Sequence, residues 1–233
     1  MPGFVDYFFS LNFALGAGIT LALTLLSMIL GIAGGLVLAL VKTSGIRVLQ
    51  APTDLYIWLF RGTPILLQLI FIFNALPQMG LRFSAFTSAV IALSLNESAY
   101  MAEIIRAGIE SVDKGQRSAA RVLGLRDNQI MRYVVLPQAM RLIVPPTGNQ
   151  FIGMLKMSAL ASVIAVQDLL LRAQRIASAN FDYVDTLLAA ACWYLILTTL
   201  FTYGQRWLEQ RMDVSKRKRP AAAAGAAFTS DNR

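Results

Sequence analysis

Long apolar segments separated by short polar ones dominate the chain, and their lengths predict helices that cross a membrane. A helix needs about 20 apolar residues to span the hydrocarbon core of a bilayer. Five segments reach that length, at residues 15–41, 51–76, 86–105, 144–171 and 186–208. The pattern therefore predicts an all-α, polytopic membrane protein with about five transmembrane helices.

Two of the five segments contain features that interrupt a helix. In the second, Arg61-Gly62-Thr63-Pro64 stands inside the apolar run. Pro64 removes a backbone hydrogen bond and Gly62 loosens the turn before it, so we expect a break there. The fourth segment is longer than one span requires, which predicts a tilt or a break. Pro145-Pro146 are expected to begin its helix.

The first segment carries the spacing Gly31-x-x-x-Gly35, which lets two helices approach closely. Packing within this chain is the favoured interpretation. A dimer face between two copies is the alternative.

The segments outside the apolar runs divide the chain into three parts. Residues 1–14 are short and aromatic, and we expect them at the membrane interface, with no cleaved signal peptide. Residues 15–208 form the transmembrane domain, with a long polar loop at 106–141. Residues 209–233 form a basic tail, which is expected to be disordered and to contact anionic lipid rather than nucleic acid.

Composition supports a membrane protein and excludes several kinds of enzyme. The chain is 56% hydrophobic and 15% charged, whereas soluble domains are about 45–50% apolar and about 25% charged. It has no His and one Cys, Cys192, so neither a Cys/His zinc site nor a His-activated nucleophile can form. No phosphate-binding G-x-x-x-x-G-K-[ST] motif occurs. We expect no catalytic residue, no metal site and no cofactor in this chain.

The distribution of basic residues predicts the orientation. Lys42 and Arg47 follow the first crossing, and the 106–141 loop and the tail are also basic. The loop after the second crossing has only Arg82, and the loop after the fourth is balanced in charge. Basic loops stay in the cytoplasm, so the N-terminus is expected outside, and the 106–141 loop and C-terminus inside. The net charge of +8 fits this cytoplasmic excess.

Within the 106–141 loop, Gly115 and Gly124 bracket a predicted short helix over 116–123. Its apolar residues provide a packing face, and Arg117, Ser118 and Arg121 make the rest of its surface polar. A short amphipathic helix between membrane crossings is typical of a segment that a second protein binds.

This loop resembles the "EAA" coupling loop of ABC-importer permeases. The matching residues are Ser118-Ala119-Ala120, then Gly124, then Val134-Val135-Leu136-Pro137. The family's Glu is Ser118 here, so a contact made by that carboxylate is not expected. Four more stretches resemble the polar-amino-acid branch of the family, and the resemblance runs from about residue 17 to about 208. These stretches are 60–64, 99–109, 114–116 and 158–164.

The resemblance implies the permease subunit of an ATP-driven, binding-protein-dependent importer of polar amino acids in the cell inner membrane. It implies cytoplasmic ATPase subunits that bind ATP and Mg, an external amino-acid-binding protein, and a second permease, either a copy or a paralogue. Ala119 and Ala120 are expected to fit a groove of the ATPase, and Gly124 to allow its close approach. The full set of expected coupling residues is Gly115, Arg117, Ser118, Ala119, Ala120, Val122, Leu123, Gly124 and Leu125.

Polar residues at helical spacing inside the crossings are the candidate substrate pathway. Asn96, Tyr100 and Glu103 form one stripe, and Asn149, Gly153 and Lys156 form another. Charged groups inside a membrane segment are functional candidates by default. The expected pathway residues are Arg61, Asn96, Glu97, Tyr100, Lys156 and Ser158.

Each of the charged residues also has a structural interpretation. Arg61 could extend its guanidinium to the cytoplasmic surface. Glu103 could pair with Arg106 near the membrane edge. Lys156 could form an internal ion pair, for example with Glu97.

Two other functions compete with the permease. An ion-coupled secondary transporter of amino acids would be expected to show more crossings, internal repeats and buried acidic relays. A membrane-anchored scaffold or enzyme is the third possibility, and the absence of a nucleophile, metal cluster or cofactor loop argues against the enzyme.

Overall fold

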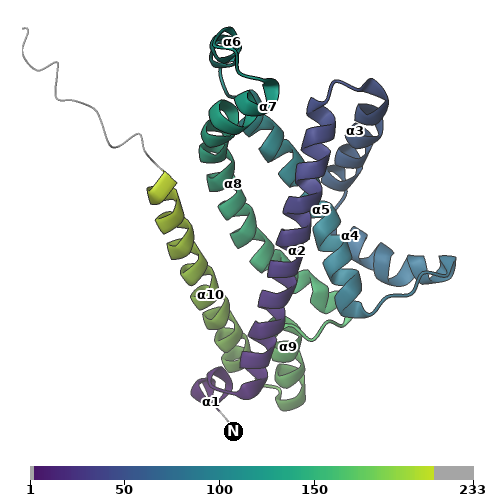
Figure 1. Cartoon of the computed structure of the whole chain (residues 1–233). Helices are drawn as coiled ribbons and strands as arrows, with labels where there is room; N and C mark the ends of the chain where they lie inside the picture. The colour runs from purple at the N-terminus through teal and green to yellow at the C-terminus, as the bar shows by residue number, and fades with distance from the viewer. Residues whose placement is uncertain (1–2, 213–233) are drawn as a thin grey trace, which may run out of the picture.

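The structure, a computed structural model, describes residues 3–212, and every regular element in that range is helical (Figure 1). The long helices α2 (Leu11–Thr43) and α5 (Ala85–Glu110) pack along each other at the centre. On one side lie α3 (Arg47–Gly62) and α4 (Ile65–Ile70), and on the other α8 (Leu136–Met157) and α10 (Tyr183–Met212). The short helices α6 (Lys114–Val122) and α7 (Asp127–Ile130) project from one end of the molecule.

Glycine residues of α2 permit the close contact with α5. A Cβ atom at Gly31 would lie 2.6 Å from Cγ of Glu97, and one at Gly35 would lie 2.5 Å from Cβ of Met101. Neither gap accommodates a side chain, because real Cβ contacts are longer. The Gly31-x-x-x-Gly35 spacing therefore serves packing within the chain, which confirms the favoured interpretation.

The predicted break in the second apolar segment is confirmed. Helix α3 ends at Gly62, and the chain bends by 104° before the run from Ile65 to Met79. That run comprises α4, a π-helical turn (Phe71–Ala75) and a 3-10 helix (Leu76–Met79). Pro64 precedes α4 with an extended backbone, which accounts for the sharp turn.

The fourth apolar segment also breaks, as predicted. Helix α8 continues into a 3-10 helix (Ser158–Ile164), and α9 (Leu169–Asn180) follows at an angle of 51°. The prediction that Pro145-Pro146 begin this helix is wrong, because α8 begins at Leu136 and contains both prolines in its interior. Pro137 lies in the first turn of α8, directly after the π-helical turn Met131–Val135.

The polar region after the fourth segment is more ordered than expected. Residues 172–185 are predicted as a loop, yet α9 covers most of them. Asp168 begins α9, because its Oδ1 accepts a hydrogen bond from the N–H of Leu171 at 2.9 Å. Leu169, Ala173 and Ala177 then recur every four residues and are buried. The prediction is wrong because this apolar stripe is sparse.

By length and composition, α2 and α10 can each cross a membrane, and counting each bent pair as one span gives up to four. These helices contain or overlap the segments predicted from the sequence. Helix α5 is long enough but more polar, since Asn96, Glu97 and Ser98 lie near its middle. The number of five crossings and the orientation of the termini stay predictions.

The N-terminal segment packs on the last helix. In α1 (Phe4–Phe8), the carbonyl of Phe8 accepts a hydrogen bond from Nε1 of Trp193 at 2.9 Å. The placement of residues 1–14 at the membrane interface stays a prediction. Most of the predicted basic tail, 213–233, lies outside the described residues.

Candidate functional site

The break between α3 and α4 leaves backbone carbonyls without helical partners, and two amide side chains bind them. Nε2 of Gln68 lies 2.9 Å from the carbonyl oxygen of Phe60 and 2.8 Å from Oγ1 of Thr63. Nδ2 of Asn96, on α5, lies 2.9 Å from the same Phe60 oxygen and 3.2 Å from Oε1 of Gln68. Buried backbone groups in a membrane need such partners, so these hydrogen bonds stabilise the break.

A polar cavity of about 480 Å³ opens at this break. The guanidinium of Arg61 lies over the ring of Tyr100, 5.3 Å from its centroid. This arrangement gathers a cation, an aromatic ring and amide groups in one hollow, which is the usual make-up of a small-molecule site. The polar and aromatic residues that line the cavity are Arg61, Thr63, Asn96, Tyr100 and Gln150.

Three of the six predicted pathway residues line the cavity, namely Arg61, Asn96 and Tyr100. Glu97 lies one position round α5 from Asn96, against Gly31 of α2, and is fully buried. The amide of Gln150, which lines the cavity, lies close to the Glu97 carboxylate, although neither carboxylate oxygen has a hydrogen bond of good geometry among the described residues. An uncompensated polar group of this kind is costly in a protein interior.

The other two predicted residues lie apart from the cavity. Lys156 is exposed on α8 and forms no ion pair with Glu97 within residues 3–212, so the suggested internal pair is wrong. The reason is that the two side chains lie in different environments, one exposed and one buried. Ser158 is buried and donates to the carbonyl of Leu155 at 2.9 Å.

Two polar side chains at the break were missed in the sequence. Gln68 interrupts the apolar run after Pro64, and this position is a usable signal because an amide inside such a run needs a partner. Gln150 also lines the cavity. It follows Asn149 in the sequence, but the helical spacing that defines the second polar stripe includes Asn149 and not Gln150.

The coupling segment forms the expected short helix, α6, with caps at both ends. Oδ1 of Asp113 accepts a hydrogen bond from the N–H of Gly115 at 2.6 Å. At the other end, the N–H of Leu125 bonds to the Ala120 carbonyl at 3.2 Å, and that of Gly124 to the Arg121 carbonyl at 3.0 Å. This is a Schellman cap, which requires a left-handed residue, and Gly124 supplies it with φ of +82°.

The apolar residues of α6 and of the turn after it differ in burial, since some pack against this chain and others face outward. Ala120 is 6% exposed and packs with Ile130 and Val135 of its own chain, with Leu125 against the same core. Val122 and Leu123 are 88% and 80% exposed. Ala120 is thus turned inward, while Gly115, Ser118, Ala119, Val122, Leu123 and Gly124 are exposed.

A chain of ion pairs joins the three helices α2, α3 and α5. Nζ of Lys42 on α2 lies 3.0 Å from Oδ1 of Asp54 on α3 and 2.8 Å from Oε1 of Glu103 on α5. Arg106 joins Glu103 at 2.8 Å, which confirms the predicted pair, and Glu110 at 2.5 Å. The bond to Glu103 raises the pKa of the Arg106 guanidinium, so that side chain stays charged.

Helix α6 is tied to this network through α5. Nη2 of Arg117 donates to the carbonyl of Ile109 at 2.5 Å, and Arg121 pairs with Asp127 of α7 at 2.8 Å. The Arg117 bond thus links α6 to the C-terminal end of α5. Between Gly3 and Met212, no group of three His, Cys, Asp or Glu side chains could hold a metal ion.

Comparison with known proteins identifies the family. Residues 31–214 match the family described as "Binding-protein-dependent transport system inner membrane component". The arginine transport system permease protein ArgU of Corynebacterium glutamicum is 44% identical over 222 residues, covering 89% of this chain and 70% of the relative. The arginine transport system permease protein ArtQ of Bacillus subtilis is 39% identical over 198 residues, covering 84% of this chain and 90% of the relative.

Solved structures show the same fold. A crystal structure of an amino acid ABC transporter with histidines matches with a TM-score of 0.81 and 44% identity, over 86% of this chain and 94% of that chain. A chain of the MetNI methionine ABC transporter, facing inward, matches with a TM-score of 0.72 and 18% identity, over 86% and 96% of the two chains. This second match concerns the fold alone. The chain therefore belongs to the family of binding-protein-dependent transport system inner membrane components.

Proposed function

We propose that this chain is the permease subunit of an ATP-driven importer of polar amino acids and forms its translocation pathway. The observation that carries the proposal is the match, at 44% identity, to a solved amino acid ABC transporter over most of both chains. A separate ATPase supplies the energy, since the sequence has no phosphate-binding loop. No observation favours the ion-coupled alternative.

In this proposal the cavity at the helix break receives the substrate. An amino acid carries a carboxylate and an ammonium group, and both need charged or hydrogen-bonding partners once water is removed. Arg61 can bind the carboxylate with two parallel N–H groups, and Gln150 supplies an amide beside it. Asn96 acts mainly by holding the break, because its amide already binds the Phe60 carbonyl.

Glu97, Lys156 and Ser158 remain proposed pathway residues beyond that cavity. They lie on α5 and at the end of α8, the two helices that also supply Tyr100 and Gln150 to the cavity. A path that runs along these helices passes from the cavity towards them. The proposed partner permease, whether a copy or a paralogue, would close the open side of the cavity.

The ATPase is proposed to bind the exposed face of α6. Val122 and Leu123 offer the largest apolar contact there, with Ala119 and Gly124 beside them. ATP can change the permease only if the ATP-bound ATPase binds one of its states more tightly. The proposed contact set is Gly115, Arg117, Ser118, Ala119, Val122, Leu123, Gly124 and Leu125, with Ala120 supporting it from inside.

Reconstitution of this permease with its ATPase and binding protein in liposomes tests the transport mode. Uptake of a polar amino acid should require ATP inside and should survive collapse of the ion gradients by an ionophore. Uptake that stops with the gradients and continues without ATP would instead identify a secondary transporter.

The pathway assignment is tested in the same liposomes by replacing Arg61 with Gln. Loss of one charge-assisted bond to the substrate predicts uptake about 10- to 100-fold slower. Arg82→Gln, which removes an equal charge from the exposed loop before α5, is the matched control and should transport normally. Equal uptake by the two variants would remove Arg61 from the substrate site.

A further inference from the structure

Glu97 carries a carboxylate into the interior of the chain, where nothing neutralises it. It is fully buried on α5, and α2 leaves room for it at Gly31, where a Cβ atom would lie 2.6 Å from Cγ of Glu97. Neither carboxylate oxygen has a hydrogen bond of good geometry within residues 3–212. A buried acid without a partner costs stability, so stability does not account for this residue.

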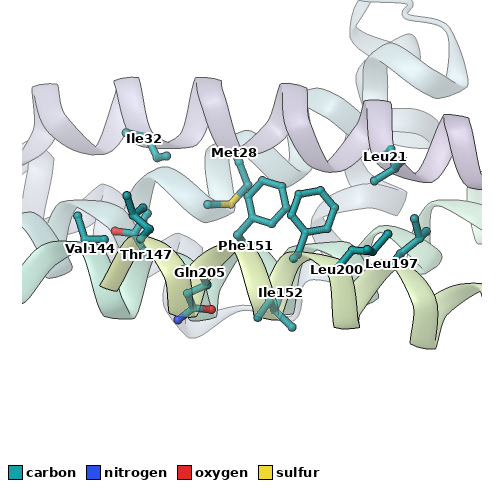
Figure 2. A pocket seen from close by; sticks show the side chains of 14 residues that line it. Leu21, Met28, Ile32, Val144, Thr147, Phe151, Ile152, Leu197, Leu200 and Gln205 are labelled. Atoms are coloured by element: carbon teal, nitrogen blue, oxygen red, sulfur yellow. The ribbon is translucent and has the colours of Figure 1, made fainter. Parts of the chain in front are cut away.

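Apolar side chains close off one side of Glu97. Met28 of α2 and Leu93 of α5 belong to one buried cluster, and Phe151 of α8 packs against it. Figure 2 shows Met28 and Phe151 close together between their helices. Met28 is three residues before Gly31, and Leu93 is four before Glu97, so this cluster lies one helical turn from the carboxylate. It offers the carboxylate no hydrogen-bond donor in that direction.

Gln150 connects Glu97 to the polar cavity at the helix break. Its side chain lines the cavity, and its amide lies close to the Glu97 carboxylate. The other amide in the lining is Asn96, whose Nδ2 already donates to the carbonyl of Phe60 and to Oε1 of Gln68. Gln150 is therefore the lining amide that can turn towards Glu97.

An ionised carboxylate fixes the direction of a neighbouring amide. A carboxylate only accepts hydrogen bonds, whereas an amide has an NH2 group that donates and an oxygen that accepts. The NH2 group of Gln150 therefore turns to Glu97, and its Oε1 is left for the cavity. Among the described residues, the lining contains the cation Arg61 and no acid. This oxygen, with the charge of Glu97 behind it, is thus the part of the wall that attracts a positive group.

We propose that Glu97 is a positioning residue for the substrate, which orients Gln150 so that its Oε1 accepts a hydrogen bond from the ammonium group of the amino acid. The inference rests on the function proposed above, in which Arg61 binds the carboxylate. Arg61 belongs to α3 and Gln150 to α8, so a bound amino acid bridges these two helices. A molecule that lacks the ammonium group binds one of them only.

Glu97→Gln tests the inference in liposomes that contain the permease with its ATPase and binding protein. Gln has nearly the shape of Glu but no charge, so it no longer fixes the direction of Gln150. ATP-driven uptake of radiolabelled polar L-amino acids, tested one at a time, should be about tenfold slower at saturating loaded binding protein. The concentration of binding protein that gives half the maximal rate should not change, because the binding protein docks outside the cavity.

Asp168→Asn is the matched control. Asp168 is also fully buried, and its Oδ2 has no hydrogen-bond partner within residues 3–212. It caps α9 and does not line the cavity, and Asn caps a helix as well as Asp does. Uptake by this variant should stay within about twofold of wild type. Thermal unfolding then separates function from stability, since Glu97→Gln removes an unpartnered buried charge and should keep or raise Tm.

A relocated charge gives the decisive measurement. In the double variant Glu97→Gln/Gln150→Glu a carboxylate faces the cavity directly, and uptake should recover roughly fivefold over Glu97→Gln. Equal uptake by Glu97→Gln and Asp168→Asn overturns the inference, and so does a double variant no faster than Glu97→Gln. A fall in Tm that accounts for the lost uptake also overturns it, because Glu97 would then serve folding. Absence of ATP-driven uptake in wild type would overturn the proposed function itself, so the two failures are distinguishable.

Discussion

Glu103 is the shared acceptor of the ion-pair chain that joins α2, α3 and α5, and replacing it with Gln should destabilise the permease. Its two oxygens bind Lys42 and Arg106, each at 2.8 Å. These three side chains are only 19–29% exposed, whereas Asp54 and Glu110 at the ends of the chain are 59% and 53% exposed. The inner bonds should therefore carry most of the stabilisation.

The magnitude follows from this exposure. Hydrogen bonds to charged groups contribute about 1.5–3 kcal/mol when buried, and exposed ion pairs about 0.2–1 kcal/mol. The bonds of Glu103 lie between these limits, so about 1 kcal/mol for each gives about 2 kcal/mol in all. For a chain of this size, that lowers Tm by about 4–8 °C. Asp54→Asn, which removes only the outer bond of Lys42, should cost less than about 0.5 kcal/mol.

A double-mutant cycle isolates the central pair. Lys42→Met, Glu103→Gln and the double variant are compared with wild type by thermal unfolding in nanodiscs. We expect a coupling energy of about 1 kcal/mol, because residues in direct contact are not additive. If α6 moves α5 as proposed, Glu103→Gln in the reconstituted importer should also transport less substrate per ATP hydrolysed. Additivity within about 0.3 kcal/mol would refute the reasoning.

Three further predictions concern other contacts. Gly124→Ala should destabilise α6 by about 1–2 kcal/mol because of its left-handed backbone, and Gly124→Asn by less; faster amide exchange in α6 would report this. Gly31→Leu should abolish a monodisperse peak in size-exclusion chromatography, since its Cβ would meet Cγ of Glu97 at 2.6 Å. Gly18→Leu is the matched control and should keep the peak, because Gly18 is exposed on α2 and its Cβ would meet nothing within 4 Å. Replacing Val122 and Leu123 together by Ser should weaken ATPase capture at least tenfold with Tm unchanged, because both are exposed. Capture equal to that of wild type would place the docking face elsewhere.

Local sequence rules predicted the long helices well. The apolar runs at 15–41, 86–105 and 186–208 lie within α2, α5 and α10, because a continuous apolar run of that length has few other stable forms in a membrane. The break at Pro64 was also predicted from the sequence. Pro145-Pro146 misled the prediction, since nothing local shows that Gln205 of α10 lies within 3.3 Å of the Pro145 carbonyl.

The candidate site could be predicted only in part, because it too depends on contacts between helices that are distant in sequence. Spacing along α5 placed Asn96 and Tyr100 on one face, and the structure directs both to the break. It could not show that Glu97 turns towards α2 while Lys156 stays exposed, because that depends on how separate helices pack. The inward turn of Ala120 likewise depends on the core below α6.

The two amides that hold the helix break also impose an order on synthesis of the chain. Gln68 follows Phe60 by 8 residues, whereas Asn96 follows it by 36. At about 5–20 residues per second, the ribosome needs about 2–7 seconds to reach Asn96 after Phe60 has been made. During that interval only one of the two amide partners of the Phe60 carbonyl has been made. The second transmembrane segment therefore reaches its final bonding only once the third has been delivered into the bilayer.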